Sequence, residues 1–214
     1  TNSSSFAAST SYLSKNIAIN LKVEKTPGSS TIDESYLSIA RGNYSFTLGS
    51  KKNWWGPGWH GSLALSSNAS PLTGLLIERN FSDGPQLEYL NWIGPWDLSF
   101  LYSKIDNSRK FYGLRVGIRP LQNLEIGLTG TSIGNVKELT CELSECNGSA
   151  INHKESSYNL TGLDFRSSHD SRDIPYAFYG QIMSESFKDS MALFGFETWG
   201  IIDTSKKYEG YRIY

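Results

Sequence analysis

The sequence has 214 residues, of which 38% are hydrophobic and 19% charged, and its 20 basic and 21 acidic residues leave a formal net charge of −1. This balance argues against a nucleic-acid-binding protein, which needs a clustered basic surface. No stretch approaches the run of about 18 apolar residues that a membrane-spanning helix needs, so a helical membrane protein is excluded. A membrane β-barrel stays possible, because only every second residue of its strands faces lipid. The chain begins at Thr1, and we expect that any targeting segment has been removed or was never included.

Apolar and polar residues alternate with a period of two over residues 17–24, again over 44–49 and 96–103, and in further segments up to residue 197. We count roughly eleven such segments of about ten residues, which is the length of a tilted strand that crosses a membrane. Their polar faces carry Gly, Ser, Asn and paired charges, which suits a water-filled lumen better than the outer face of a soluble sandwich. With no helix of useful length and no linker, the sequence predicts a single all-β domain over residues 1–214, an antiparallel transmembrane β-barrel of the outer-membrane type.

The alternation stops in residues 53–81, which include a block of closely spaced tryptophans. The block consists of Trp54, Trp55, Gly56, Pro57, Gly58, Trp59 and His60. Its Gly-Pro-Gly centre predicts a compact turn that fans the indoles out. An indole face stacks on a sugar ring and its N–H donates to hydroxyls, so the tryptophans are candidate polysaccharide contacts, and the histidine is a further one. The same side chains could instead pack a barrel interior or a bilayer interface, and the sequence leaves both interpretations open.

The clearest alternation covers residues 111–119 and, after a tight turn, residues 124–129. The polar face of the first segment consists of Gly113, Arg115, Gly117 and Arg119. We predict that this face lines the lumen, with Glu125 close enough to compensate the charge, and that the apolar face contacts lipid. A shift by one residue would place both arginines in hydrocarbon, at a cost of about 2–4 kcal/mol each. In a later alternating segment, Asp164 and Arg166 are also expected to be lumen charges.

The two cysteines, Cys141 and Cys146, have no histidine beside them and make a poor zinc site, so we predict no metal site. We expect a small loop-closing disulfide, which implies an oxidising compartment. Followed from hairpin to hairpin, the short connections fall at one end of the predicted barrel, whereas longer ones around 83–85, 106–108 and 134–156 fall at the other. Outer-membrane barrels have short periplasmic turns and long external loops, so the cysteine loop is predicted to lie outside the cell.

Several motifs occur in a fixed order over most of the chain. They are Trp54–Trp59, Ser62-Leu63, Leu65-Ser66, Asn68-Ala69, Pro71, Arg79-Asn80, Ile93–Trp96, Arg119–Leu121, Leu124–Leu128, Gly162–Arg166 and Tyr179–Gln181. In this order they resemble the Wzi-type capsule assembly proteins of the Gram-negative outer membrane. The resemblance implies a large β-barrel that acts as an outer-membrane lectin and anchors capsular or other surface polysaccharide. Barrels of this family are longer, so we expect residues 1–214 to form an incomplete or reduced barrel.

The resemblance also implies partners: surface polysaccharide and outer-membrane lipid, no nucleic acid, and a monomeric protein. Many capsules carry uronic acids, and a guanidinium pairs with a carboxylate through two N–H groups, so Arg79 is the expected charged contact beside the tryptophans. We predict no enzyme and no cofactor, because the carboxylates and histidines stand in no recognisable catalytic motif.

Two alternatives to an anchoring lectin stay open. One is a passive outer-membrane channel for sugars or small solutes, built on the same barrel. The other is a soluble β-sandwich that acts as a carbohydrate-binding module.

Overall fold

The computed structural model describes residues 6–26, 28–81, 83–106, 109–134, 158–170, 174–185, 189–204 and 207–213. These residues form thirteen strands and one short 3-10 helix, η1 (Glu88–Ile93). The strands are β1 (Phe6–Leu13), β2 (Ile17–Thr26), β3 (Ser29–Thr31), β4 (Tyr36–Arg41), β5 (Tyr44–Ser50), β6 (Thr73–Arg79), β7 (Trp96–Lys104), β8 (Lys110–Leu121), β9 (Leu124–Gly134), β10 (Tyr158–His169), β11 (Tyr176–Glu185), β12 (Asp189–Thr204) and β13 (Lys207–Ile213).

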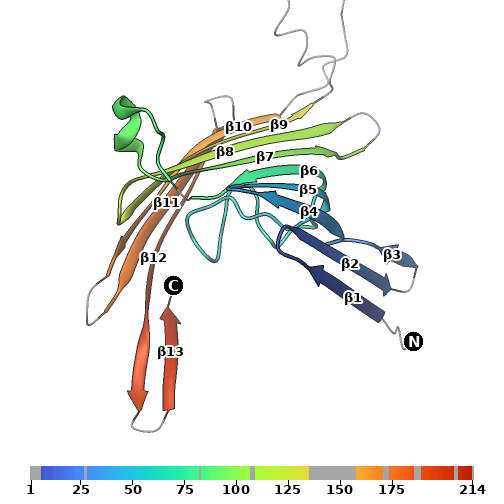
Figure 1. Cartoon of the computed structure of the whole chain (residues 1–214), viewed down its shortest axis with the longest axis horizontal. Helices are drawn as coiled ribbons and strands as arrows, with labels where there is room; N and C mark the ends of the chain where they lie inside the picture. Colours follow the sequence, from blue (N-terminus) through green and yellow to red (C-terminus); the bar gives the residue numbers. More distant parts are fainter. Residues whose placement is uncertain are drawn as a thin grey trace, which may run out of the picture.

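All thirteen strands belong to one antiparallel sheet, in which the order in space follows the order in the chain from β1 to β13. Only β3 lies off this path, paired with β2. Figure 1 shows that the sheet curves into an open arch with β1 and β13 at its two ends. The prediction of an all-β antiparallel fold is confirmed, and the sandwich alternative is wrong for the described residues, because they form a single sheet instead of two packed ones.

The number of strands exceeds the roughly eleven that alternation predicts. β3 has three residues, too few to show a period, and β1 (FAASTSYL) is rich in small polar residues that mark neither face. β6 (TGLLIER) has apolar residues on both faces and therefore does not alternate. Within the part of the chain that the structure describes, no helix is long and apolar enough to cross a membrane.

Because β6 does not alternate, the sequence pattern does not indicate it, and each strand reverses the end of the sheet at which the next connection lies. The connection 80–95 carries η1 and lies at the same end of the sheet as the two-residue turn at 122–123, since Trp96 pairs with Ile118. The prediction that residues 83–85 lie at the long-connection end is therefore wrong. That end holds the connections 51–72 and 105–109, and β9 ends and β10 begins there.

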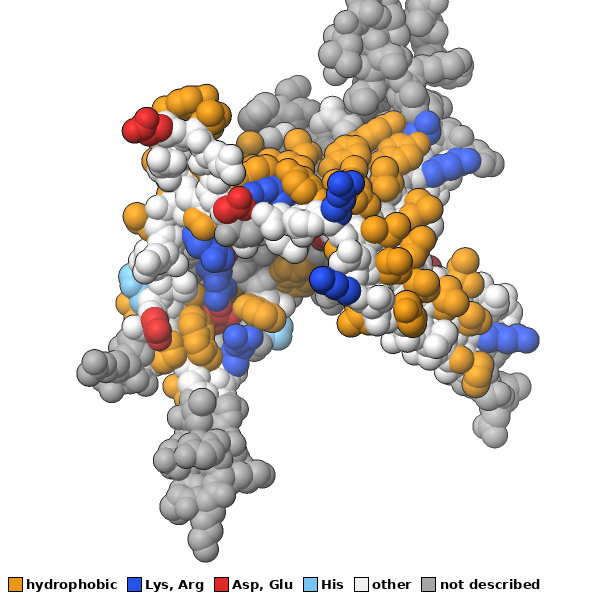
Figure 2. Space-filling model, in the orientation of Figure 1, with side chains coloured by type: hydrophobic (Ala, Val, Ile, Leu, Met, Phe, Trp, Pro, Cys, Tyr) orange, Lys and Arg blue, Asp and Glu red, His pale blue; other side chains and the backbone are white. Residues whose placement is uncertain are grey.

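The two faces of the sheet differ in chemistry. On β8, Gly113, Gly117 and Arg115 lie on the concave side, whereas Leu114 lies on the convex side and is 46% exposed. Figure 2 shows hydrophobic side chains gathered over the outer surface of β7 to β9. The alternation read from the sequence thus separates an apolar convex face from a polar concave face.

Candidate functional site

The connection 51–72 leaves the ends of β5 and β6 and crosses the concave face of the sheet, under the arch of β7 to β11 (Figure 1). Buried Gln181 on β11 holds it from both sides: its side-chain oxygen accepts from the Leu63 N–H at 2.7 Å, and its Nε2 donates to the Trp55 carbonyl at 3.0 Å. The Trp55 N–H donates to the Leu65 carbonyl at 2.9 Å, and Arg166 donates to the Pro57 carbonyl at 3.1 Å. The tryptophan block is thus fixed to the strands before any ligand arrives.

Trp55 is a packing residue. Its side chain is 2% exposed and forms a core with Leu76, Leu101 and Phe111. The indole packs directly over Gly113, where a side chain would not fit, because a Cβ on this glycine would lie 2.7 Å from two ring carbons. A face that is already covered by protein cannot stack on a sugar, so the structure favours the packing interpretation for this tryptophan.

The other two tryptophans line a cavity of about 600 Å³ on the concave face. Trp54 is half-buried, whereas Trp59 is 59% exposed and has the Arg212 guanidinium 4.4 Å from its ring centroid. The full lining consists of Trp54, Gly56, Pro57, Gly58, Trp59, Ser67, Glu125 and Arg166. Aromatic faces next to a carboxylate, a guanidinium and a hydroxyl are the groups that contact sugar rings and their hydroxyls. Exposed His60 directly follows Trp59 in the chain but does not line this cavity.

Arg79 lies on the other side of the sheet. Arg79 pairs with Leu98, whose side chain faces outward. On β6, Arg79 lies three positions after Leu76, which faces inward and packs against Trp55. Its guanidinium bonds to the Trp96 carbonyl and to Asp83, at 2.7 Å, and stacks 3.7 Å from the Trp96 ring centroid, so it is 5% exposed. The expectation that Arg79 is the charged contact beside the tryptophans is wrong, because an odd step along a strand reverses the face. The arginine that lines the cavity beside Trp54 and Trp59 is Arg166.

The concave face carries three ion pairs between neighbouring or next-but-one strands. Arg115 of β8 reaches across β9 to Asp164 of β10, with a bond from Nη2 to Oδ1 of 2.9 Å. Gly127 of β9 allows this reach, because its Cβ would lie 2.5 Å from the guanidinium nitrogens. The other two pairs are Arg119–Glu125 and Arg166–Glu197. The structure therefore brings all five predicted lumen charges together and adds Glu197, whose partner the sequence did not indicate.

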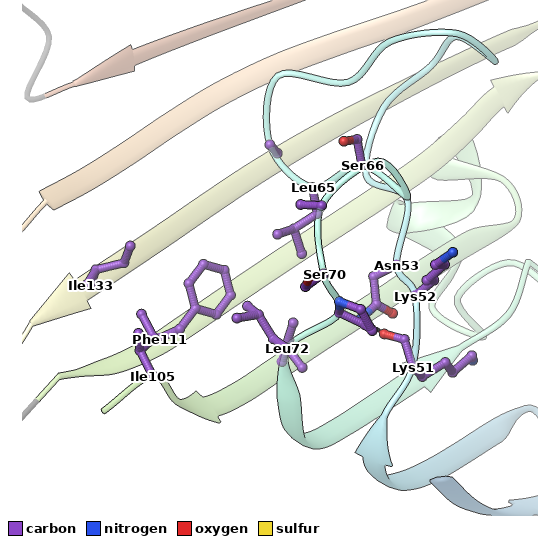
Figure 3. A pocket seen from close by; sticks show the side chains of 14 residues that line it. Lys51, Lys52, Asn53, Leu65, Ser66, Ser70, Leu72, Ile105, Phe111 and Ile133 are labelled. Atoms are coloured by element: carbon purple, nitrogen blue, oxygen red, sulfur yellow. Dashed lines mark hydrogen bonds between the residues drawn. The ribbon is translucent and has the colours of Figure 1, made fainter. Parts of the chain in front are cut away.

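A second cavity, of about 270 Å³, lies at the long-connection end of the same face. Figure 3 shows apolar lining residues, with Phe111 and Ile133 on the sheet and Ile105 directly after β7, and polar lining residues on the connection, among them Asn53 and Ser70. Nearby, Lys22 and Lys52 bind the same carboxylate, Glu34, at 2.8 and 3.1 Å. The hydrogen bonds from Lys22 and Lys52 hold the pKa of Glu34 below its ordinary value.

In the described ranges, no group of three or more His, Cys, Asp or Glu side chains is placed to hold a metal ion. The predicted disulfide between Cys141 and Cys146 lies outside the described residues.

Comparisons with known proteins bear on the family and the fold of this chain. The family model of the capsule assembly protein Wzi matches residues 2–201. An uncharacterized 55.8 kDa protein of the cps region of Klebsiella pneumoniae is 27% identical over 163 residues, which are 71% of this chain and 32% of that protein. Wzi of Escherichia coli, described as a carbohydrate-binding β-barrel of the outer membrane involved in group 1 capsule assembly, superposes with a TM-score of 0.74 at 22% identity, over 97% of this chain and 49% of that one.

This chain therefore spans about a third of the length of the Klebsiella relative and about half that of the solved E. coli protein. The structural likeness confirms the fold, and the family model covers nearly the whole sequence given. The chain belongs to the capsule assembly protein Wzi family.

Proposed function

We propose that this chain is part of an outer-membrane β-barrel that binds capsular or other surface polysaccharide during capsule assembly and catalyses no reaction. The observation that carries the proposal is the tryptophan-lined cavity on the polar concave face, bordered by Arg166 and Glu125. Membership of the Wzi family supports it, and so does the carbohydrate binding described for the E. coli relative.

The chemistry of the two faces supports a membrane location. Strand residues on the convex face are apolar and exposed; those on β8 to β11 include Leu114, Leu128, Leu163, Phe165, Phe178 and Ile182. Such a surface is costly in water and suits the hydrocarbon of a bilayer, whereas the ion pairs of the concave face suit a lumen. In this arrangement the end of the sheet that holds the turn 122–123 and the connection 80–95 faces the periplasm, the connections 51–72 and 135–157 begin and end at the external side, and the protein acts as a monomer.

The cavity has the size and the lining of a carbohydrate site. Its volume lies within the range of about 300–1,000 Å³ that small-molecule sites occupy. The hydrogen bonds of Gln181 and Arg166 to the connection hold Trp54 and Trp59 in place, so little ordering entropy is lost when a sugar binds. Arg166 supplies positive charge for an acidic sugar, although it already pairs with Glu197, so the ligand would share this guanidinium.

Replacing Trp54 and Trp59 together by alanine should weaken the binding of a purified acidic capsular polysaccharide about 30-fold. The estimate assumes about 1 kcal/mol for each lost stacking contact. Isothermal titration calorimetry with the detergent-purified protein measures the change, and heat-modifiable gel mobility reports whether the barrel still folds.

Trp92→Ala is the matched control, because Trp92 is 65% exposed on η1 and does not line the cavity. Unchanged affinity of the Trp54/Trp59 variant, in a protein that folds normally, would remove the role assigned to this cavity. Equal losses in the variant and in the control would do the same.

The channel alternative finds less support. The connection 51–72 crosses the concave face and is tied to β10 and β11, so it occupies space that an open channel would need. A single-channel conductance of the intact protein in a planar bilayer would speak for a channel, and the absence of any conductance would speak for a closed binding protein.

A further inference from the structure

Two lysines face each other at one end of the convex surface. Lys104, the last residue of β7, is paired in register with Lys110, the first residue of β8. Like charges directly opposite each other on one face of an antiparallel pair are destabilising, because their Cβ atoms lie only about 5 Å apart. Within the part of the chain that the structure describes, neither lysine forms an ion pair with a carboxylate, and Asp106 of the same hairpin pairs with Arg109 at 2.7 Å. The hairpin therefore presents an uncompensated positive charge.

The residues next to this pair are aromatic. Tyr102 and Tyr112 form the adjacent outward-facing pair of the same strands, with ring centroids 5.3 Å apart, and the Lys110 ammonium lies 5.9 Å from the Tyr102 ring centroid. Figure 2 shows basic side chains at this end of β7 and β8, beside the hydrophobic surface of these strands. Lysines that extend past a tyrosine pair at the border of an apolar surface are placed at headgroup level in a bilayer.

A groove begins beside the tyrosines and continues along the convex face. Its volume is about 370 Å³, and its floor includes Gly130, where a Cβ would meet no heavy atom within 4 Å. Phe100, Tyr112 and Leu114 form the apolar side of the groove, and Ser132, Asn159 and Thr161 form the polar side. Tyr112 lies both in this groove and in the tyrosine pair beside Lys110, so a half-apolar groove and a pair of lysines lie close together on one face. This arrangement suits a lipid, with a place for an anionic headgroup and a place for a chain.

We propose that Lys104, Lys110 and the groove over Gly130 bind a phosphorylated glycolipid of the outer leaflet. The two ammonium groups pair with a phosphate, which removes the repulsion between them, and an acyl chain lies in the groove. The hairpin lies at the long-connection end of the sheet, and this assigns the site to the outer leaflet. The inference rests on the membrane location and orientation given under the proposed function, but not on the polysaccharide site, which lies on the opposite face.

The test measures lipid binding by the detergent-purified full chain. Native mass spectrometry detects the bound lipid, with lipid A, its dephosphorylated form and phosphatidylglycerol as probes. Replacing both lysines, Lys104→Gln with Lys110→Gln, should weaken lipid A binding on the order of 30-fold. Removal of the phosphates from the lipid should cause a loss of similar size with the unchanged protein. Because the substitution also relieves a like-charge contact, the variant should fold at least as well as the unchanged protein, so a loss of binding is not a loss of structure.

A matched control removes the same charge elsewhere. Lys15→Gln with Lys25→Gln changes two exposed lysines, of which Lys25 is paired with Phe6 and not with another cation. This control should bind lipid A within about twofold of the unchanged protein, because no cross-strand ammonium pair is lost. A second variant, Gly130→Leu, places a side chain in the groove at a position where a Cβ meets no heavy atom within 4 Å, and it should weaken binding of the acylated lipid while both lysines remain.

Each result decides the inference. Equal affinity of the Lys104/Lys110 variant and its control, or equal binding of phosphorylated and dephosphorylated lipid, would overturn it. Stronger binding of phosphatidylglycerol than of lipid A would overturn the assignment to an outer-leaflet glycolipid, and unchanged binding by Gly130→Leu would remove the groove from the site. Failure of the polysaccharide proposal would show separately, as normal polysaccharide binding by the Trp54/Trp59 variant with lipid binding intact.

Discussion

Replacing Trp55 by alanine should lower the free energy of unfolding by about 3–5 kcal/mol, the range for removing a large aromatic side chain from a packed core. The indole is 2% exposed and packs against Leu76, Leu101 and Phe111, which lie on β6, β7 and β8. Gly113, which lies against the ring, has no side chain that could move into the space left by the indole, so a cavity would remain. Urea unfolding in lipid vesicles measures the loss in the free energy of unfolding, with heat-modifiable gel mobility as the readout.

Trp59→Ala should change stability by less than about 1 kcal/mol, because its ring is 59% exposed and its removal leaves no closed cavity. Trp55→Phe should cost less than Trp55→Ala, since part of the packing remains. A Trp55→Ala protein as stable as the unchanged one, but unable to retain polysaccharide, would show that this residue is a ligand contact and not a packing residue.

Replacing Arg115 by alanine should destabilise the protein by about 3–5 kcal/mol, because it leaves the carboxylate of Asp164 without its partner. The two side chains are 15% and 4% exposed, so water can do little to replace the lost bonds. The N–H groups of Arg115 also reach Thr129 at 3.2 Å, so its loss removes bonds to both β9 and β10. The same unfolding assay measures the effect, with the midpoint urea concentration as the readout.

Arg109→Ala provides the matched control. Arg109 pairs with Asp106 at 2.7 Å, but the two side chains are 60% and 39% exposed, so the change should cost about 0–1 kcal/mol. Replacing both Arg115 and Asp164 by leucine should recover much of the stability lost in Arg115→Ala, because no uncompensated charge remains. Equal effects of Arg109→Ala and Arg115→Ala would contradict a buried role for the Arg115–Asp164 pair.

The sequence by itself determined the fold class and the two faces of most strands. A period of two places residues 112, 114 and 116 on one side and Arg115 on the other, whatever the neighbouring strands do, because successive side chains of a strand point to opposite faces. Over β7 to β12, turning each strand over would place charged residues in lipid and apolar residues in the lumen, which is too costly. The sequence alone therefore predicts which side chains face lipid and which face the lumen.

Only the tertiary structure decided which side chains meet. The tryptophan block has no period, so nothing local showed that the connection 51–72 turns under the sheet, buries Trp55 and leaves Trp59 exposed. β6 has apolar residues on both faces, because Leu76 packs against that connection while Leu75 and Ile77 face outward. The strand therefore shows no alternation in the sequence. Without it, neither the end of the sheet at which residues 80–95 lie nor the face on which Arg79 lies could be predicted. The pairs of Arg115 with Asp164 and of Arg166 with Glu197 likewise depend on strand order and register, which join residues 49 and 31 positions apart in the chain. Periodicity acts within one strand, whereas contacts between strands depend on how the whole sheet curves and on what crosses its concave face.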